Sequence, residues 1–155
     1  MDATITIISA LTALAAVILA PLVSIYVVRK EVNAQVISTN RQVWINRLRD
    51  ELAHFIRDVR HVPSSHAADA ITFKEAIARY EDMALRAERI QLLLNPLEAD
   101  HTTLMELILT ALSKTQHAID SGVGSAEGQD SIADKVISAA QPVLKREWVR
   151  VKKGK

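Results

Sequence analysis

The sequence predicts an all-α protein with one N-terminal transmembrane helix followed by a cytoplasmic antiparallel helical bundle of about four helices. Three observations lead to this fold class. An uncharged run opens the chain, and apolar residues further on recur at helical spacing. Only four Gly and four Pro interrupt 155 residues, and aromatic residues make up 4%, so a few long helices are favoured over a sheet.

The first predicted element is a membrane-spanning helix. The run ITIISALTALAAVILAPLVSIYVV covers residues 5–28 and contains no charged residue. A helix of this length rises roughly 36 Å, which exceeds a hydrocarbon core of about 30 Å. A cleaved signal peptide would have basic side chains before a shorter apolar run. Here only Met1 and Asp2 precede the uncharged stretch that begins at residue 3, and neither side chain is basic. We therefore expect residues 1–30 to form an uncleaved N-terminal transmembrane anchor.

The charges that flank the run predict its orientation. Arg29 and Lys30 follow it directly, and with Tyr26 they are expected to anchor it at the membrane interface. This places the N-terminus outside and the remainder of the chain in the cytoplasm. Within the run, small residues recur every fourth position, a spacing that would allow two helices to approach closely. This helix-association row consists of Thr12, Ala16, Ala20 and Ser24. A plain monomeric anchor is the alternative.

The strongest amphipathic pattern follows the run, from about Glu31 to Val62. At 100° per residue one face gathers the apolar positions, which predicts the first core helix of the bundle. These positions are Ile37, Trp44, Leu48, Leu52, Phe55, Ile56, Val59 and Val62. The VPSSH segment at residues 62–66 is expected to end this helix.

Three further helices are predicted within the bundle, which we assign to residues 31–150. The second runs from Ala67 or Thr72 to Leu94, with its buried face at Phe73, Ile77, Tyr80, Ala84 and Ala87. The third is expected to begin with Asn95 as N-cap, Pro96 at N1 and Glu98 as a capping residue at N3. It should bury Leu97, Leu104, Met105, Ile108, Leu112 and Ile119. The fourth starts near Ser131 and carries Ile132, Val136, Ala140, Leu144 and Trp148.

Two Glu-x-x-His tetrads raise the possibility of a metal site. Di-iron bundles place such tetrads on two helices, and here they comprise Glu51 with His54 and Glu98 with His101. On the helical wheel His101 falls within the apolar arc of its helix, whereas His54 lies about 130° from the centre of its arc. The two tetrads therefore do not fit one buried site, so we predict no metal, cofactor or catalytic residue. A membrane-tethered carboxylate/His metal enzyme is the alternative.

The C-terminal segment LKREWVRVKKGK is basic around one tryptophan. Its cations are Lys145, Arg146, Arg150, Lys152, Lys153 and Lys155, and residues 151–155 form the predicted tail. Such a segment can contact anionic lipid headgroups, can complement the negative end of a helix dipole, or can be merely solvated. The middle of the chain is acidic and both flanks are basic, so the charge pattern makes nucleic acid an unlikely partner.

Two segments carry a resemblance. RQVWINRLRDELAHF at residues 41–55 and RIQLLLNPLEADHTTLMELI at residues 89–108 resemble stretches in a group of small bacterial or phage proteins with a single N-terminal span. The resemblance covers roughly residues 1–120. It implies a bacterial inner-membrane setting and brings no activity, cofactor or site residue.

The sequence thus favours a single-pass, membrane-anchored interaction protein, namely a scaffold, adaptor or sensor subunit that self-associates and has a cytoplasmic protein partner. The absence of cysteine excludes disulfides and Cys-ligated zinc sites. Peripheral binding of anionic lipid through the basic tail is a further alternative.

Overall fold

The computed structural model shows four helices in the residues that it describes, which are 2–123 and 126–152. Within these ranges the side chains of residues 2–6, 11, 12, 15, 16, 20, 33, 34 and 126 are not described. The helices are α1 (Asp2–Ala67), α2 (Phe73–Leu93), α3 (Ala99–Ser121) and α4 (Ala126–Lys152). No strand occurs among the described residues, so the all-α prediction is confirmed.

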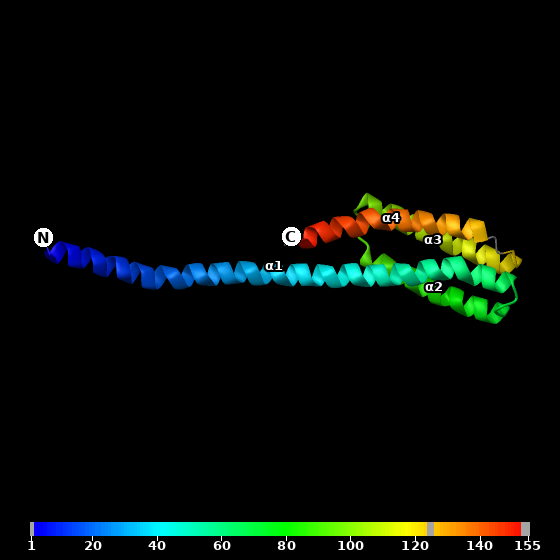
Figure 1. Cartoon of the computed structure of the whole chain (residues 1–155), viewed down its shortest axis with the longest axis horizontal. Helices are drawn as coiled ribbons and strands as arrows, with labels where there is room; N and C mark the ends of the chain where they lie inside the picture. Colours follow the sequence, from blue (N-terminus) through cyan, green and yellow to red (C-terminus); the bar gives the residue numbers. More distant parts are fainter. Residues whose placement is uncertain (1, 124–125, 153–155) are drawn as a thin grey trace.

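Helix α1 is one continuous helix of 66 residues. Figure 1 shows that α2, α3 and α4 gather around its second half, while its first half projects alone from the bundle. α1 contacts all three other helices, whereas α2 and α4 do not contact each other in the described part of the chain. The predicted helical bundle is therefore confirmed, and α3, like α1, contacts all three other helices.

The core-facing residues of α1 follow the predicted pattern in its second half. Leu48, Leu52, Phe55 and Val59 are buried against the other three helices. Ile45 is buried as well, although it was not predicted, whereas Ile37 is 49% exposed because it lies where α1 leaves the bundle. The core residues of the other helices are Met83, Ala87 and Ile90 in α2, Leu104, Ile108 and Ala111 in α3, and Ile132, Ala133, Val136, Ala140 and Val143 in α4.

The expected end of α1 at VPSSH is wrong, because the helix continues through Pro63 to Ala67. The continuation keeps Val62 in a small cluster with Ala76 of α2 and Ile119 of α3. The hydroxyl of Ser64 donates to the carbonyl oxygens of Arg60 and His61 in the turn around the proline. Apolar burial on both sides of the α1–α2 connection thus compensates for the backbone hydrogen bond that Pro63 cannot make.

Of the two starts predicted for α2, Ala67 and Thr72, the second is correct, because Thr72 is the N-cap and forms a capping box with Glu75. The backbone N–H and the hydroxyl of Thr72 both donate to the Glu75 carboxylate, and these hydrogen bonds lower the pKa of Glu75 below its ordinary value. The predicted buried face of α2 is rotated, because Ala76, Met83 and Ile90 are buried while Phe73 is 53% exposed. Burial of Ala87 was predicted correctly.

The predicted start of α3 is wrong. Asn95 accepts the backbone N–H of Leu97 through its side chain at 3.1 Å, and its carbonyl accepts the N–H of Glu98 at 3.1 Å. These bonds make residues 95–98 a separate turn before α3, so Leu97 stands at its tip with 92% of its surface exposed. Glu98 makes no side-chain capping bond, so its predicted capping role is wrong too.

Helix α4 begins at Ala126, which is earlier than the predicted Ser131. Burial of Ile132, Val136 and Ala140 was predicted correctly, whereas Trp148 is 41% exposed because it lies on the outer side of the last turns of α4.

Searched over the described residues, no helix offers a stretch that is both long enough and apolar enough to cross a membrane. The transmembrane helix predicted over residues 5–28 is thus not supported by the described residues. That stretch includes seven residues whose side chains are not described, which are residues 5, 6, 11, 12, 15, 16 and 20.

Phe55 gives the most direct test of the core. Replacing Phe55 with Ala should lower the free energy of unfolding by about 3–5 kcal/mol, because loss of the buried ring leaves a cavity. The matched control is Leu109→Ala on the exposed surface of α3, which should change it by less than about 0.5 kcal/mol. Denaturant unfolding followed by circular dichroism measures both, and equal effects would contradict the packing of α1.

Candidate functional site

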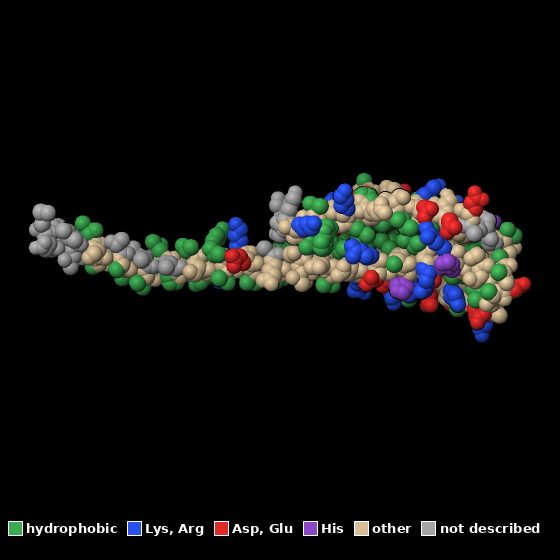
Figure 2. All heavy atoms as spheres, in the orientation of Figure 1, with side chains coloured by type: hydrophobic (Ala, Val, Ile, Leu, Met, Phe, Trp, Pro, Cys, Tyr) green, Lys and Arg blue, Asp and Glu red, His purple; other side chains and the backbone are tan. Residues whose placement is uncertain are grey.

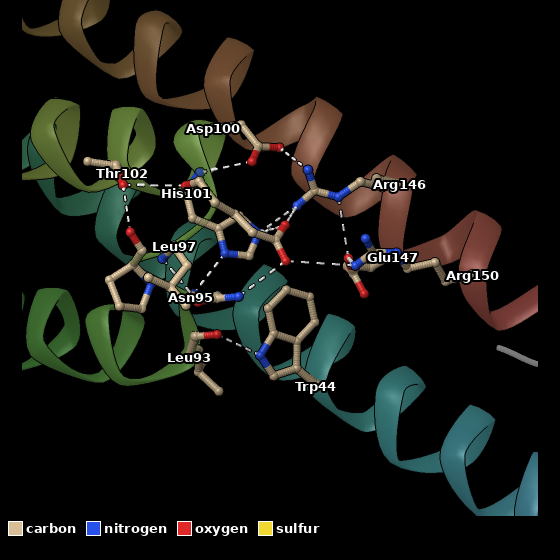
Figure 3. A network of polar contacts seen from close by, with 12 residues as sticks. Trp44, Leu93, Asn95, Leu97, Asp100, His101, Thr102, Arg146, Glu147 and Arg150 are labelled. Atoms are coloured by element: carbon tan, nitrogen blue, oxygen red, sulfur yellow. Dashed lines mark hydrogen bonds and ion pairs between the residues drawn. The ribbon is translucent and has the colours of Figure 1, made fainter.

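A dense polar network lies where α1 leaves the bundle. It joins α1, the turn between α2 and α3, the start of α3 and the last turns of α4 (Figure 3). The charged members are Arg41, Glu98, Asp100, Arg146, Glu147 and Arg150. We call this set, together with Trp44, Asn95 and His101, the junction network.

Glu147 is the buried acid of the junction network, with only 6% of its surface exposed. Its carboxylate lies 3.3 Å from Nε of Arg41, 2.6 Å from Nη1 of Arg150 and 3.5 Å from Nε of Arg146. A buried carboxylate is costly without partners, and the Arg41 guanidinium, the partner supplied by α1, holds this part of α4 against α1.

Arg146 links α4 to the start of α3. Its Nη1 donates to Oδ2 of Asp100 at 2.7 Å, and its Nη2 pairs with the carboxylate of Glu98. Partial burial opposes ionisation of Asp100, but the hydrogen bond and the positive charge of Arg146 outweigh burial and lower the pKa of Asp100 below its ordinary value. The pKa of Arg146 is raised despite partial burial, chiefly by the hydrogen bond to Asp100.

His101 fastens the turn between α2 and α3. It is 3% exposed, and its Nδ1 accepts the backbone N–H of Asn95 at 2.8 Å. Its ring stacks on Trp44, with ring centroids 6.3 Å apart. The indole N–H of Trp44 in turn donates to the carbonyl of Leu93 at 2.8 Å, which satisfies a carbonyl left open at the end of α2. His101 is therefore buried, as expected from its position within the apolar arc of its helix.

The hydrogen bond from Asn95 also fixes the tautomer of His101. A backbone N–H can only donate, so Nδ1 carries no proton and the proton of the neutral ring lies on Nε2. The carboxylate of Glu98 lies 3.7 Å from this Nε2. Nη2 of Arg146 lies 3.0 Å from Nε2, and this is a close contact between two N–H groups, not a hydrogen bond.

Glu98, Asp100 and His101 are the one group of potential metal ligands found among the described residues, and their ligand atoms lie within 4.8 Å of one another. The guanidinium of Arg146 contacts all three side chains, so it takes the place that a cation would occupy. A metal would also need an unprotonated Nε2, which the Asn95 hydrogen bond opposes. In this arrangement the cluster is built as an ion-pair network.

The two predicted tetrads do not come together. Glu51 pairs with Arg86 of α2 at 3.2 Å and with Arg89 at 3.6 Å, and His54 is exposed. Glu98 and His101 belong to the junction network at another contact of the bundle. The structure thus assigns Glu51 to an ion pair between α1 and α2.

The predicted site residues in the first half of α1 lie on its projecting part. Tyr26, Arg29 and Lys30 are exposed there. Of the helix-association row, Ser24 is exposed, and the side chains of Thr12, Ala16 and Ala20 lie outside the described residues.

The predicted basic segment divides into paired and exposed cations. Arg146 and Arg150 form ion pairs inside the junction network. Lys145 is exposed, and Nζ of Lys152 lies 5.5 Å from the ring centroid of Trp148. Lys153 and Lys155 lie outside the described residues.

Sequence reasoning missed Glu147 and Arg41. The signal for Glu147 was present, because it continues the buried series of Val136, Ala140 and Val143 at helical spacing. An acidic residue on an apolar face needs a buried cation, and Arg41 supplies one from a helix 106 residues earlier in the chain. The sequence alone does not predict the pair of Arg41 and Glu147, because only the folded chain brings the two residues together.

A groove of about 400 Å³ adjoins the junction network. Ile37, Asn40 and Trp44 line it from α1, and Glu147 and Arg150 line it from α4. The network holds three arginines and three carboxylates, so its formal charges balance. What this arrangement can do is hold the end of the bundle rigidly onto α1.

Comparison with known proteins adds no relative. No protein-family model matches the chain, and neither curated proteins nor solved structures give a match. The resemblance to small bacterial single-span proteins therefore stays a prediction.

Removing the charge of Glu147 tests the junction network. Glu147→Gln keeps the shape but leaves three arginines close together, so we expect the free energy of unfolding to fall by roughly 3 kcal/mol. The control is Glu106→Gln on the exposed face of α3, with an expected change below about 0.5 kcal/mol. Unfolding by denaturant at pH 7 measures both, and a stable Glu147→Gln protein would refute the role of this carboxylate.

Asp100 makes stability depend on pH. Because its pKa is lower in the folded than in the unfolded chain, its stabilising contribution is present above about pH 4 and is lost as the pH falls through the folded pKa. Asp100→Asn should therefore flatten the loss of unfolding free energy between roughly pH 5 and pH 2. Parallel curves for the wild type and the variant would count against the ion pair with Arg146.

Proposed function

We propose that this chain is a membrane-anchored helical interaction protein, with the first part of α1 in a bacterial inner membrane and the bundle in the cytoplasm. One observation carries the proposal. Every large apolar side chain described between residues 7 and 28 is at least 44% exposed. These residues are Ile7, Ile8, Leu14, Val17, Ile18, Leu19, Leu22, Val23, Ile25, Tyr26, Val27 and Val28.

The exposed apolar residues lie on all sides of α1. Residues 17–19 and 25–28 are consecutive, and steps of 100° carry them around the helix. Figure 2 shows hydrophobic side chains along the projecting part, whereas charged side chains gather over the bundle. Water is a poor solvent for such a surface, and the uncharged composition of residues 3–28 favours lipid as its surroundings.

The orientation follows from Arg29 and Lys30, which would lie on the cytoplasmic side. The N-terminus is then outside. The bundle acts through protein contacts in this proposal, as a scaffold, adaptor or sensor subunit that self-associates through α1 and recruits a cytoplasmic protein. The junction network supports it, because the ion pair of Arg41 with Glu147 joins α1 to α4 at the point where α1 leaves the bundle.

Contact with anionic lipid is a second candidate role, favoured by the position of the end of α4. The hydroxyl of Ser38 lies 3.4 Å from the carbonyl oxygen of Val151, so α4 ends beside α1 ten residues after Val28. Ten helical residues rise about 15 Å. The exposed Lys145 and Lys152 would contribute to such contact, since Arg146 and Arg150 are already paired.

Membrane fractionation tests the anchor. The full chain should stay with bacterial membranes through alkaline carbonate washing and be released by detergent. Because the chain has no cysteine, Asp2→Cys and Ser138→Cys each provide a single labelling site. A membrane-impermeant maleimide should label residue 2 in intact spheroplasts and residue 138 only after lysis. Release by carbonate would refute the anchor, and the reverse labelling pattern would refute the orientation.

A further inference from the structure

An apolar stripe on α1 faces away from the bundle. Val32, Val36 and Val43 are 50%, 52% and 61% exposed, respectively, and they are spaced by four and seven residues. In this part of α1 the residues that face the other helices are Ser38, Arg41 and Ile45. Ser38 comes two positions after Val36, and Ile45 comes two positions after Val43. Two residues correspond to about 160° around the helix, so the valine stripe lies opposite the bundle contact.

The stripe has the spacing of a coiled coil. With Val36 and Val43 at position a, position d falls on Val32 and Thr39, which gives the alternation of four and three residues that two supercoiled helices require. Arg29 occupies the preceding position a, where its long side chain can extend outward to keep its charge in water, and before it the same spacing continues at Ile25, Leu22 and Ile18, which are described and exposed.

The residues that flank the stripe suit a second copy of this chain. In a parallel pair of identical helices, positions e and g meet identical chemistry, so charges of one sign would repel. Here positions e are Asn33 and Asn40, and positions g are Gln35 and Gln42. These amides are uncharged, and amides can hydrogen bond to one another.

We infer that two copies of α1 pair in parallel through Val32, Val36 and Val43, with the two bundles on the outside of the pair. Residues 29–43 span only two heptads, so the pairing relies on its continuation into residues 18–28. It therefore rests on the proposed function, because a shared membrane would hold both copies parallel. The helix-association row lies on a different face, because its centre is about 160° from the centre of the valine stripe at 100° per residue.

Single-cysteine crosslinking of the full chain in its membranes tests this pairing, since the chain has no cysteine of its own. Val36→Cys and Val43→Cys should form disulfide-linked dimers on mild oxidation. The matched control is Ile37→Cys, which is adjacent, apolar and 49% exposed but points away from the stripe. We expect at least about five times more dimer at residue 36 than at residue 37, because the a positions of a parallel pair face each other.

The double substitution Ala16→Leu and Ala20→Leu, introduced into the Val36→Cys protein, distinguishes the valine stripe from the helix-association row as the interface. Crosslinking should be unchanged if the stripe forms the interface, and its loss would assign the interface to the small-residue row and overturn the inference. Equal crosslinking at residues 36 and 37 would overturn it as well, and so would a product whose mass differs from twice that of the chain. Carbonate washing of the same samples reports on the anchor separately, so failure of the pairing in retained protein leaves the proposed function intact.

Discussion

The continuity of α1 is the constraint on which the rest of the structure depends. One helix of 66 residues carries an apolar, uncharged first part and an amphipathic second part, with no break between them. The second part supplies the face on which α2, α3 and α4 pack. A helix transmits its orientation along its axis, so whatever surrounds the first part also positions the bundle.

The junction network sets where the bundle ends along this helix. Apolar packing dominates from Ile45 onward, and the polar pairs between Arg41, Glu147 and Arg150 close the end of α4. Burial of Glu147 is unfavourable in isolation, and of the three guanidinium groups that offset this cost, Arg41 does so only when α1 and α4 are aligned. Such a network adds little to the net free energy of unfolding. Its main effect is to favour one arrangement of the helices over others.

Local patterns in the sequence were sufficient to predict most of the fold. They were not sufficient to predict which side chains pair across different helices. Leu48 and its neighbours were assigned to the core correctly because amphipathic periodicity is a property of one helix. The start of α2 was left between Ala67 and Thr72, although the capping box of Thr72 and Glu75 spans only four residues. Asn95 was misassigned because its side chain can accept a backbone N–H either as a helix N-cap or in a separate turn. The structure has the separate turn, and Leu97 at its tip is exposed. Glu147 was missed because its partner Arg41 lies on another helix, and because its partners Arg146 and Arg150 were assigned to a basic segment.

In the proposed function, the first part of α1 lies in the hydrocarbon core, in contact with lipid or with a second copy of itself, while the second part carries the bundle outside the membrane. The most direct measurement is a spin-label scan of single cysteines from residue 7 to residue 43 of the full chain in lipid vesicles. Labels at residues 7–28 should be reached by oxygen and shielded from a water-soluble nickel complex, whichever way they point, with a change between residues 28 and 32. Access of the nickel complex to one helical face throughout residues 7–28 would contradict the account.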